Sequence, residues 1–347
     1  MPEMMQAACF AGAGKLELRE VPVPEPGPGE VLLTIRACGI CGSDLHQFAG
    51  RWPQPPFVPG HEITGEISAV GEGVCEWTPG DRVCVEPFLY CGHCRYCRAG
   101  RYYQCSEMGF LTLTADGGFA EQMVCPAYTL YRLAPNVDFV TGALAEPLAV
   151  GVHAVRIVGV NGADEVLVLG AGAIGQMTAA AARAFGARRV AITARHDFQA
   201  DAARRMGVDA VLSTDPATLK QQVADFFPLG PSAVFETVGS AHGTFQQAVD
   251  LAGRLGRVAL LGGNTGPVAS FDFTPIPTKE LTLYAPLAYA QIGTRRDFEV
   301  ALELLAADPE GYAHLITHRV PLSDLPAAFE LATDKRYSGA LKAVMVR

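Results

Sequence analysis

The sequence predicts an α/β protein with two domains: a barrel-like antiparallel β domain, and a doubly wound parallel sheet. Three observations support this prediction. The chain has 347 residues, of which 49% are apolar and only 18% charged, so it is long enough to bury two cores. Before about Gly151, short strand-like segments alternate with proline and glycine. After it, continuous apolar runs alternate with helix-like segments, which is the rhythm of a parallel sheet.

The β domain is predicted from short apolar segments bounded by turns. Segments such as PGPG and TPGD lie between them, and proline and glycine interrupt regular structure there. The expected strands are residues 6–12, 16–23, 29–40, 62–73 and 81–88. The single cysteines among these segments are expected to be small buried hydrophobic residues; they are Cys9, Cys38, Cys75, Cys84 and Cys125.

The parallel-sheet domain is predicted from apolar strands that lead into glycine. Val166–Leu169 is a continuous apolar run, which is typical of a strand buried on both faces. A helix is expected to follow to about Phe185, and then a strand over Arg189–Thr193. Later apolar segments continue the pattern at residues 232–239, 256–263 and 279–286. The tail is expected to form helices over residues 297–309 and 325–335 and a terminal strand over residues 340–347.

The motif GAGAIG at residues 170–175 predicts a dinucleotide-binding turn. Glycines at this spacing, between a strand and a helix, permit a tight turn and close approach of a pyrophosphate to the helix N-terminus. Ligands of such sheets bind at the carboxyl ends of the strands. The predicted cofactor contacts are Gly170, Gly172, Ala173, Ile174, Gly175, Ala194, Arg195 and Val238.

The end of the second strand indicates which nicotinamide cofactor is used. NAD-specific domains usually place an acid there to bind the ribose 2′-hydroxyl. This chain has Ala194 and Arg195 instead, which leave room for a 2′-phosphate and offer it a guanidinium. Asp197, the nearest acid, comes three residues after Ala194 and is expected to cap the next helix. NADP(H) is therefore favoured over NAD(H).

Four cysteines lie within the fifteen-residue segment CGHCRYCRAGRYYQC: Cys91, Cys94, Cys97 and Cys105. Cysteines this close would form only small disulfide loops, with little entropic benefit. Their thiolates can surround one tetrahedral ion. A structural zinc is predicted, in a lobe at about residues 88–107. Because protein fills all its positions, this site cannot bind substrate.

Composition restricts the partners and the compartment. The net charge is −9, from 27 basic and 36 acidic residues, without basic runs, which argues against nucleic acid or an anionic membrane as the partner. The N-terminal segment has no basic start followed by an apolar run, and no apolar stretch approaches the ~18 residues of a membrane span. A cytoplasmic protein with reduced thiols is expected.

A second set of residues offers catalytic chemistry. It comprises Cys41, Ser43, Asp44 and His46 in ACGICGSDLHQF, His61 and Glu62 in VPGHEITGEI, and Glu146 in GALAEPLAV. Each is a weak signal alone. An isolated histidine, for example, is more often a surface residue or a hydrogen-bonded core residue than a metal ligand. Together they supply a thiolate, an imidazole and carboxylates, which suits a catalytic zinc with an open position.

Over essentially its full length the chain resembles the zinc-containing medium-chain alcohol/polyol dehydrogenases. The matching motifs are CGSDLH at 41–46, GHE at 60–62, GDRV at 80–83, the four cysteines, EP at 146–147 and GAGAIG at 170–175. In that family a GroES-like catalytic domain is interrupted by a Rossmann domain. The resemblance implies a catalytic domain over residues 1–150, a Rossmann domain over 151–290, and a return to the catalytic domain over 291–347.

The resemblance also implies roles for residues. Cys41 and His61 would bind the catalytic zinc. Glu146 stands where liver-type enzymes have a second cysteine, so the chain resembles the sorbitol and threonine dehydrogenase branches. Glu62 is a zinc ligand in some members, and which of the two glutamates binds the metal at rest stays open. Ser43 and His46 correspond to a proton relay.

The implied activity is hydride transfer between a secondary alcohol of a polyol or sugar-like substrate, or the matching ketone, and the nicotinamide. Two zinc ions per chain and a homodimer or homotetramer are expected, with a small-molecule alcohol or ketone as substrate. One alternative is an NAD-dependent dehydrogenase of simple alcohols or amino alcohols. Another is a zinc-free quinone-reductase-like or non-enzymatic member of the fold, which typically lacks both cysteine-containing sites.

Overall fold

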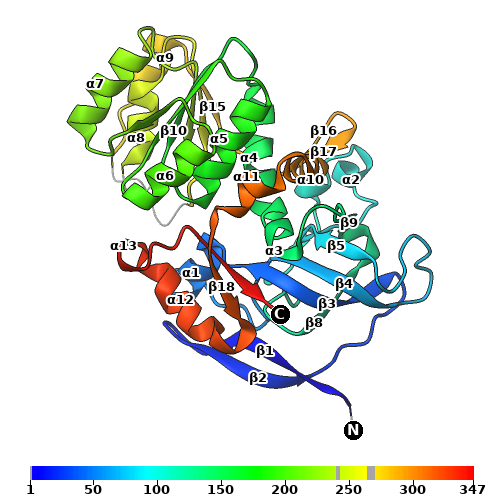
Figure 1. Cartoon of the computed structure of the whole chain (residues 1–347). Helices are drawn as coiled ribbons and strands as arrows, with labels where there is room; N and C mark the ends of the chain where they lie inside the picture. The colour runs from blue at the N-terminus through cyan, green and yellow to red at the C-terminus, as the bar shows by residue number, and fades with distance from the viewer. Residues whose placement is uncertain (1, 240–242, 264–269) are drawn as a thin grey trace. The chain divides into compact units, whose positions relative to one another are not determined.

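The computed structural model describes residues 2–239, 243–263 and 270–347. The chain forms two compact units (Figure 1). Residues 1–146 and 301–347 make the first unit, and residues 147–300 make the second. The chain therefore leaves the first unit once and returns to it.

The first unit is built around a seven-stranded sheet. β3 (Glu30–Gly39) lies at its centre and pairs with β4 (Glu62–Val70), β8 (Gln122–Pro126) and β19 (Lys342–Val346). The other strands of this sheet are β5 (Arg82–Val85), β9 (Leu130–Arg132) and β18 (Ile316–Pro321). Two small antiparallel pairs accompany it, β1 (Met4–Phe10) with β2 (Leu16–Pro22), and β6 (Phe88–Leu89) with β7 (Gly109–Phe110).

The sequence predicted a purely antiparallel sheet, but one strand pair of the seven-stranded sheet is parallel. β18 and β19 run parallel, because α12 (Leu325–Thr333) connects them and turns the chain back. β18 itself was not predicted. The core of this unit includes alternate side chains of β3, namely Val31, Leu33 and Ile35, which are fully buried. Among the single cysteines, Cys75 is exposed and Cys9 half-buried, contrary to the prediction, while Cys38, Cys84 and Cys125 are buried.

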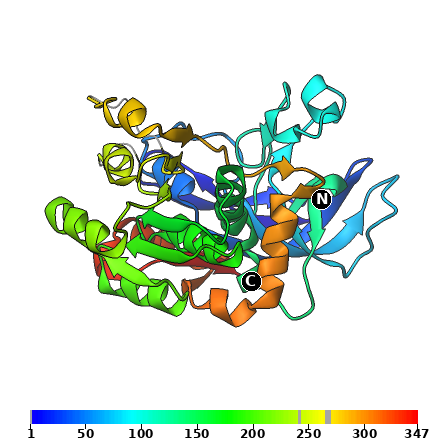
Figure 2. The same cartoon turned by 90° about the horizontal axis from the view of Figure 1, so that it is seen from above.

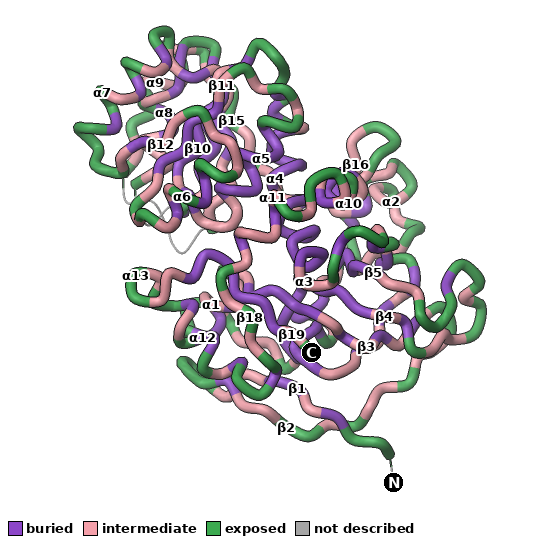
Figure 3. Tube along the Cα trace, viewed as in Figure 1, coloured by how far each residue is buried: buried purple, intermediate pink, exposed green. Residues whose placement is uncertain are grey.

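The second unit contains a six-stranded parallel sheet in the order β12-β11-β10-β13-β14-β15. Its strands are β10 (Glu165–Leu169), β11 (Arg189–Thr193), β12 (Ala210–Leu212), β13 (Ala233–Glu236), β14 (Arg257–Leu260) and β15 (Thr282–Tyr284). The inner strands β10, β11 and β13 are buried nearly throughout (Figure 3), as their continuous apolar sequences predicted. A further antiparallel pair joins β16 (Gln291–Ile292) to β17 (Arg295–Arg296).

The strand order of the parallel sheet reverses next to β10. The chain adds β11 and β12 on one side of β10 and then β13, β14 and β15 on the other. Because parallel crossovers are right-handed, this reversal places helices on both faces of the sheet (Figures 1 and 2). Ligands of such sheets bind at the strand ends beside the reversal, which is where GAGAIG lies.

Helices complete both units. In the first unit these are α1 (Gly42–Phe48), α2 (Arg95–Arg98), α3 (Phe139–Gly142), α11 (Pro309–Ala313), α12 and α13 (Lys335–Ser338). In the second they are α5 (Ala173–Ala184), α6 (Asp197–Arg205), α7 (Pro216–Phe226), α8 (Thr244–Leu251) and α9 (Pro275–Lys279). Two helices, α4 (Ala145–Val158) and α10 (Asp297–Ala307), each contain a boundary between the units.

One stretch, Phe139–Val158, is long and apolar enough to span a membrane by length and composition, although it contains Glu146 and Arg156. Of its apolar window 78% is buried inside the protein, as in the core helix of a globular fold.

Candidate functional site

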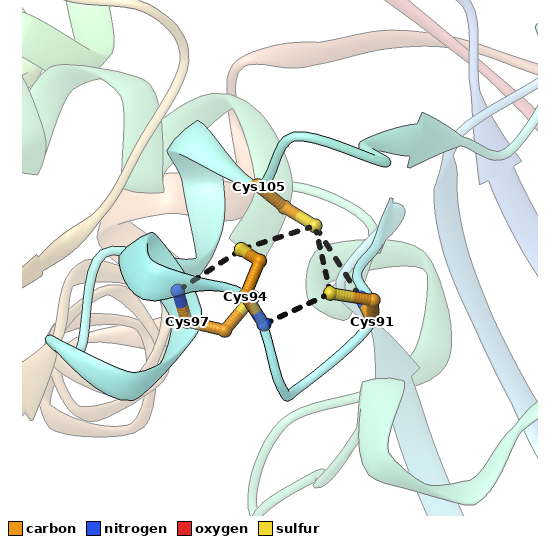
Figure 4. Close-up of side chains that lie close together, drawn as sticks. All are labelled: Cys91, Cys94, Cys97 and Cys105. Atoms are coloured by element: carbon orange, nitrogen blue, oxygen red, sulfur yellow. Dashed lines mark hydrogen bonds between the residues drawn. The ribbon is translucent and has the colours of Figure 1, made fainter.

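The four cysteines of the predicted lobe converge on one point (Figure 4). The sulfur of Cys105 lies 3.5 Å from that of Cys91 and 4.0 Å from that of Cys94. A tetrahedral zinc with Zn–S bonds of ~2.3 Å separates its sulfurs by about 3.8 Å, so these spacings fit one ion. All ten cysteines of the chain are free thiols. The geometry therefore favours a metal site over disulfides.

Backbone N–H groups of the lobe donate hydrogen bonds to the cysteine sulfurs and so favour their negatively charged, metal-binding form. The N–H of Cys94 donates to the sulfur of Cys91 at 3.3 Å, and that of Cys97 donates to the sulfur of Cys94 at 3.5 Å. The N–H groups of Cys97 and Ser106 lower the pKa of the Cys94 thiol to about 5. The lowered pKa favours the thiolate, the form that binds zinc.

Replacing Cys94 by serine is expected to release the metal of the lobe. The helix α2, which follows Cys94 and contains Cys97, has no buried residue, so little apolar packing holds this part of the lobe without the metal. We expect one fewer zinc per chain, and a fall in Tm of several degrees, since ~1 kcal/mol corresponds to about 2–4 °C in a domain of this size. Metal analysis and thermal unfolding measure both quantities. Unchanged zinc content would exclude Cys94 as a ligand.

A second group of metal-binding side chains lies in the same unit. Cys41 precedes α1, His61 precedes β4, and Glu62 is the first residue of β4. One ligand atom from each of these residues lies within 4.8 Å of the other two. His61 and Glu62 are 5% and 0% exposed, so water does not solvate them. A thiolate, an imidazole and a carboxylate with this spacing could hold one zinc ion.

Glycine 39 makes the space that the Glu62 carboxylate occupies. Gly39 and Glu62 are paired in the antiparallel ladder of β3 and β4. A Cβ atom at Gly39 would lie 1.8 Å from Oε2 of Glu62, so any other residue there would displace the carboxylate. This oxygen is buried and has no hydrogen-bond partner among the described residues. An orphaned carboxylate oxygen beside a thiol and an imidazole fits a metal ligand.

Lys342 holds the other oxygen of that carboxylate. It lies on β19, and its ammonium donates to Oε1 of Glu62 at 2.5 Å and to the carbonyl of Ile40 at 3.1 Å. Both side chains are almost fully buried, at 3% and 1% exposure. The pair fixes Glu62 with one oxygen on the lysine and the other free of protein hydrogen bonds.

The imidazole of His61 lies between Cys41 and a buried acid. Oδ1 of Asp44 is 3.8 Å from Nδ1 of His61, and Oδ2 of Asp44 accepts the backbone N–H of Cys41 at 2.9 Å. Asp44 therefore hydrogen-bonds the backbone of Cys41 and lies close to the His61 ring without hydrogen-bonding it. A carboxylate behind a metal-binding histidine commonly orients its ring.

The electrostatics of this group favour a cation. Burial lowers the pKa of His61, but the charges of Cys41, Asp44 and Glu146 outweigh it and raise that pKa well above its usual value. Burial raises the pKa of Asp44. Glu146, in the first turn of α4, is buried and acts on His61 through its charge, but it is not in the group of ligand atoms within 4.8 Å of one another.

Ser43 and His46 lie three positions apart on α1, as neighbours on a helix do. Both are half-buried. The ring of His46 packs on Trp52 with centroids 4.8 Å apart. Burial and, to a smaller extent, the charge of Arg51 lower the pKa of His46. Its imidazole is therefore neutral at pH 7 and able to accept a proton.

The glycine motif of the second unit forms a tight turn between β10 and α5. Gly170 has φ +100°, a conformation that L side chains rarely adopt, and its N–H donates to Oγ1 of Thr193 at 2.8 Å. A Cβ at Gly175 would lie 1.7 Å from the carbonyl oxygen of Gly170. A Cβ at Gly172 would meet nothing within 4 Å, so this position leaves open space at the start of α5.

The remaining predicted cofactor residues lie at strand ends of the same sheet. A Cβ at Gly170 would lie 2.5 Å from the side chain of Val238, so the turns after β10 and β13 are in contact. Arg195 is exposed and makes no hydrogen bond or ion pair with any described residue. Asp197 was predicted to cap the next helix, but this prediction is wrong. Asp197 is the first residue of α6, and His196 is the N-cap.

Three contributors were not predicted from sequence. Lys342, Gly39 and the closeness of Asp44 to His61 depend on contacts between distant segments, and Lys342 lies 280 positions from its partner. A lysine in the apolar run of a terminal strand is the only local signal, since an unpaired lysine is almost never fully buried.

Two family models match most of this chain, and curated relatives are similar to it over nearly its whole length. The alcohol dehydrogenase GroES-like domain matches residues 27–135, and the zinc-binding dehydrogenase domain matches residues 173–307. L-idonate 5-dehydrogenase of Vitis vinifera is 34% identical over 98% of this chain and 94% of its own. Sorbitol dehydrogenase of Homo sapiens is 34% identical over 92% of this chain and 90% of its own.

Solved structures are also similar over nearly the whole chain. A zinc-binding dehydrogenase from Sinorhizobium meliloti bound to NADP has a TM-score of 0.88 at 30% identity, covering 99% of this chain and 100% of its own. An alcohol dehydrogenase from Escherichia coli complexed with NADH has a TM-score of 0.89 at 27% identity, covering 99% of both chains.

Proposed function

This chain belongs to the zinc-containing medium-chain alcohol/polyol dehydrogenase family, and from that premise we propose that it oxidises a secondary alcohol of a polyol or sugar-like substrate with NADP⁺, reversibly. The observation that carries the proposal is the buried group of Cys41, His61 and Glu62, with ligand atoms within 4.8 Å of one another. The relatives act on sorbitol and L-idonate by their names, which favours a polyol or sugar acid as the substrate class.

Two metal ions per chain are proposed. Cys91, Cys94, Cys97 and Cys105 would hold the structural zinc, and Cys41, His61 and one of the glutamates would hold the catalytic one. The contact of Glu62 with Lys342 leaves Oε2 as its available ligand atom. Glu146 lies outside the group within 4.8 Å but close enough to affect His61 by its charge. The structure thus supports Glu62 over Glu146 as the carboxylate nearest to the other ligands.

The residues around this group would divide the chemistry. A bound zinc lowers the pKa of a hydroxyl group that it contacts. Ser43, at the first turn of α1, would accept the hydroxyl proton, and His46, held neutral by burial, would take it onward to solvent. Asp44 would keep the His61 ring in one orientation. The glycine turn would bind the pyrophosphate of the nicotinamide cofactor at the N-terminus of α5.

The test is a panel assay with purified protein. Polyols, sugar acids, amino alcohols and simple alcohols are each offered with NADP⁺ and with NAD⁺, and the reduced nicotinamide is followed by absorbance. We expect the highest kcat/KM for a polyol or sugar acid with NADP⁺. A preference for simple alcohols would favour the alternative dehydrogenase, and no turnover with any alcohol would contradict the proposal.

Arginine 195 is expected to set the cofactor preference. Its exposed guanidinium at the end of β11 can pair with a 2′-phosphate, and Ala194 leaves room for that phosphate. Arg195→Ala should reduce kcat/KM for NADP⁺ by about 10- to 100-fold, corresponding to the ~1.5–3 kcal/mol of a charged hydrogen bond, and leave that for NAD⁺ within twofold. Arg204→Ala, on the same unit but paired with Asp201, is the control. A wild-type preference for NAD⁺ of tenfold or more would refute this assignment.

A further inference from the structure

We propose that residues 109–119 brace His61 against the four-cysteine lobe, so that metal bound in the lobe raises the metal affinity of the site at Cys41, His61 and Glu62. The inference rests on the proposed function, since it takes this second site to be the catalytic metal centre. It assigns Phe110 as a positioning residue, acting through His61.

The first observation is a continuous chain of rings from the lobe to His61. Phe110 meets the His61 imidazole edge-on, with centroids 5.4 Å apart at 61°, and meets Phe88 at 5.4 Å and 78°. Phe88 in turn meets Tyr102 at 6.4 Å and 78°. Tyr102 lies inside the lobe, between its third and fourth cysteines, and is 3% exposed. Its hydroxyl donates to the buried carboxylate of Glu86. Aromatic rings favour edge-to-face contacts such as these. A displacement of Tyr102 would therefore disturb its contact with Phe88, and through Phe88 the contacts of Phe110 and His61.

The second observation is that the lobe closes the strand pair that carries Phe110. β6 leads into Cys91 and β7 follows Cys105, and Phe88 on β6 is the direct cross-strand partner of Phe110 on β7. A pair of two-residue strands is not stable alone. The sulfurs of Cys91 and Cys105, 3.5 Å apart, lie at the two ends of the loop between these strands. A metal bound to both sulfurs would hold the two ends of the loop together and fix the register of β6 against β7.

The third observation is that the same segment is bonded to the residues just before His61. The N–H groups of residues 117, 118 and 119 donate to the carbonyls of residues 58, 60 and 59, at 2.7, 2.7 and 3.0 Å. The side chain of Asp116 accepts the N–H of Val58 at 2.9 Å. A Cβ at Gly117 would lie 2.3 Å from the carbonyl oxygen of Gly60, so the two backbones pack without room for a side chain. Movement of the segment would therefore move Gly60 and His61.

Backbone strain in the segment is consistent with a positioning role. Thr112 is a β-branched residue at φ +82°, 3% exposed, and its N–H donates to the carbonyl of Ala115 at 2.7 Å. A β-branched side chain adopts this conformation only where its surroundings impose it. The turn between the ring of Phe110 and the bonds at residues 116–119 is thus held in one shape.

The test compares Phe110→Leu with Phe10→Leu by competition of the purified holoprotein with a chromogenic zinc chelator. Phe10 is the matched control, because it is half-buried in the same unit and makes an edge contact with Phe329 at 6.2 Å and 82°. The zinc released in wild type but missing from Cys41→Ala identifies the catalytic site. We expect Phe110→Leu to raise the dissociation constant of that site about tenfold or more, the usual cost of losing a supporting contact. Phe10→Leu should leave the dissociation constant of that site within twofold of wild type. Phe110→Tyr should have wild-type affinity, because it keeps the ring.

The coupling to the lobe is tested with Cys94→Ser. This variant should raise the zinc dissociation constant of the catalytic site by a similar factor. Adding Phe110→Leu to it should raise that constant little further, because residues 109–119 no longer hold His61 in place once the lobe has lost its metal. Equal effects of Phe110→Leu and Phe10→Leu overturn the inference, as does a folded Cys94→Ser protein with wild-type affinity at the catalytic site. If Cys94→Ser does not fold, the Phe110 comparison decides alone. Failure of the proposed function looks different: wild-type protein would then release only one zinc per chain.

Discussion

Replacing Cys41 or His61 by alanine should abolish turnover and leave cofactor binding within a few-fold. Each supplies one ligand atom to the buried group that also contains Glu62. Losing a ligand removes the charge stabilisation that a metal provides, worth several kcal/mol, or at least about 10³-fold in kcat. The predicted cofactor residues lie in the other compact unit, with the glycine turn at its centre. Cofactor binding therefore depends on different residues.

Two titrations separate these effects. Metal analysis should find one zinc per chain in both variants, and fluorescence titration with the reduced cofactor should give a dissociation constant close to that of wild type. Cys125→Ala is the matched control, since Cys125 is a buried cysteine of the same unit that belongs to neither metal group. A Cys41→Ala protein that keeps two zinc ions but no longer binds cofactor would contradict this division of roles.

Replacing Lys342 by methionine should cost about 3–5 kcal/mol of folding free energy. The Lys342–Glu62 pair is almost completely buried, and the ammonium makes two hydrogen bonds, to Glu62 and to the carbonyl of Ile40. Methionine keeps most of the volume but leaves the carboxylate buried without its counter-charge. Urea unfolding of protein from which a chelator has removed the zinc at Cys41, His61 and Glu62 measures the loss, because that zinc would otherwise supply Glu62 with a counter-charge.

Two further variants test the cause of that loss. Lys342→Met combined with Glu62→Leu should recover much of the stability, because no lone charge remains buried. Lys15→Met removes an exposed pair with Glu17, at 62% and 38% exposure, and should leave the midpoint of urea unfolding unchanged, because water screens this pair. If Lys342→Met were as stable as wild type, the pair would not hold Glu62 in place.

Local patterns predicted the parts of this protein that depend on short stretches of chain. The spacing of Cys91, Cys94, Cys97 and Cys105 predicted a group that the structure brings within 4.8 Å. The GxGxxG spacing after an apolar strand predicted the turn before α5, because the glycines are needed by the local backbone. The alternation of strand and helix predicted the doubly wound sheet.

Contacts between distant segments could not be predicted in the same way. Lys342 meets Glu62 only because β19 pairs with β3, which pairs with β4. Phe110, on β7, meets His61 across 49 positions of chain, and nothing in the sequence GFLTLT marks that contact. Phe48 and Tyr289 pack in the core against Phe329 and Phe298, partners that lie 281 and 9 positions away along the chain. Such outcomes are set by tertiary packing.

We propose that oxidation of a secondary alcohol requires a zinc ion at Cys41, His61 and Glu62. The direct measurement is the rate of NADP⁺ reduction by the best polyol or sugar acid before and after selective removal of this zinc by a chelator, followed by its return. The rate should fall to background with the loss of one zinc per chain and recover when zinc is restored, while the lobe keeps its own ion. An undiminished rate after this zinc has been removed would contradict the claim.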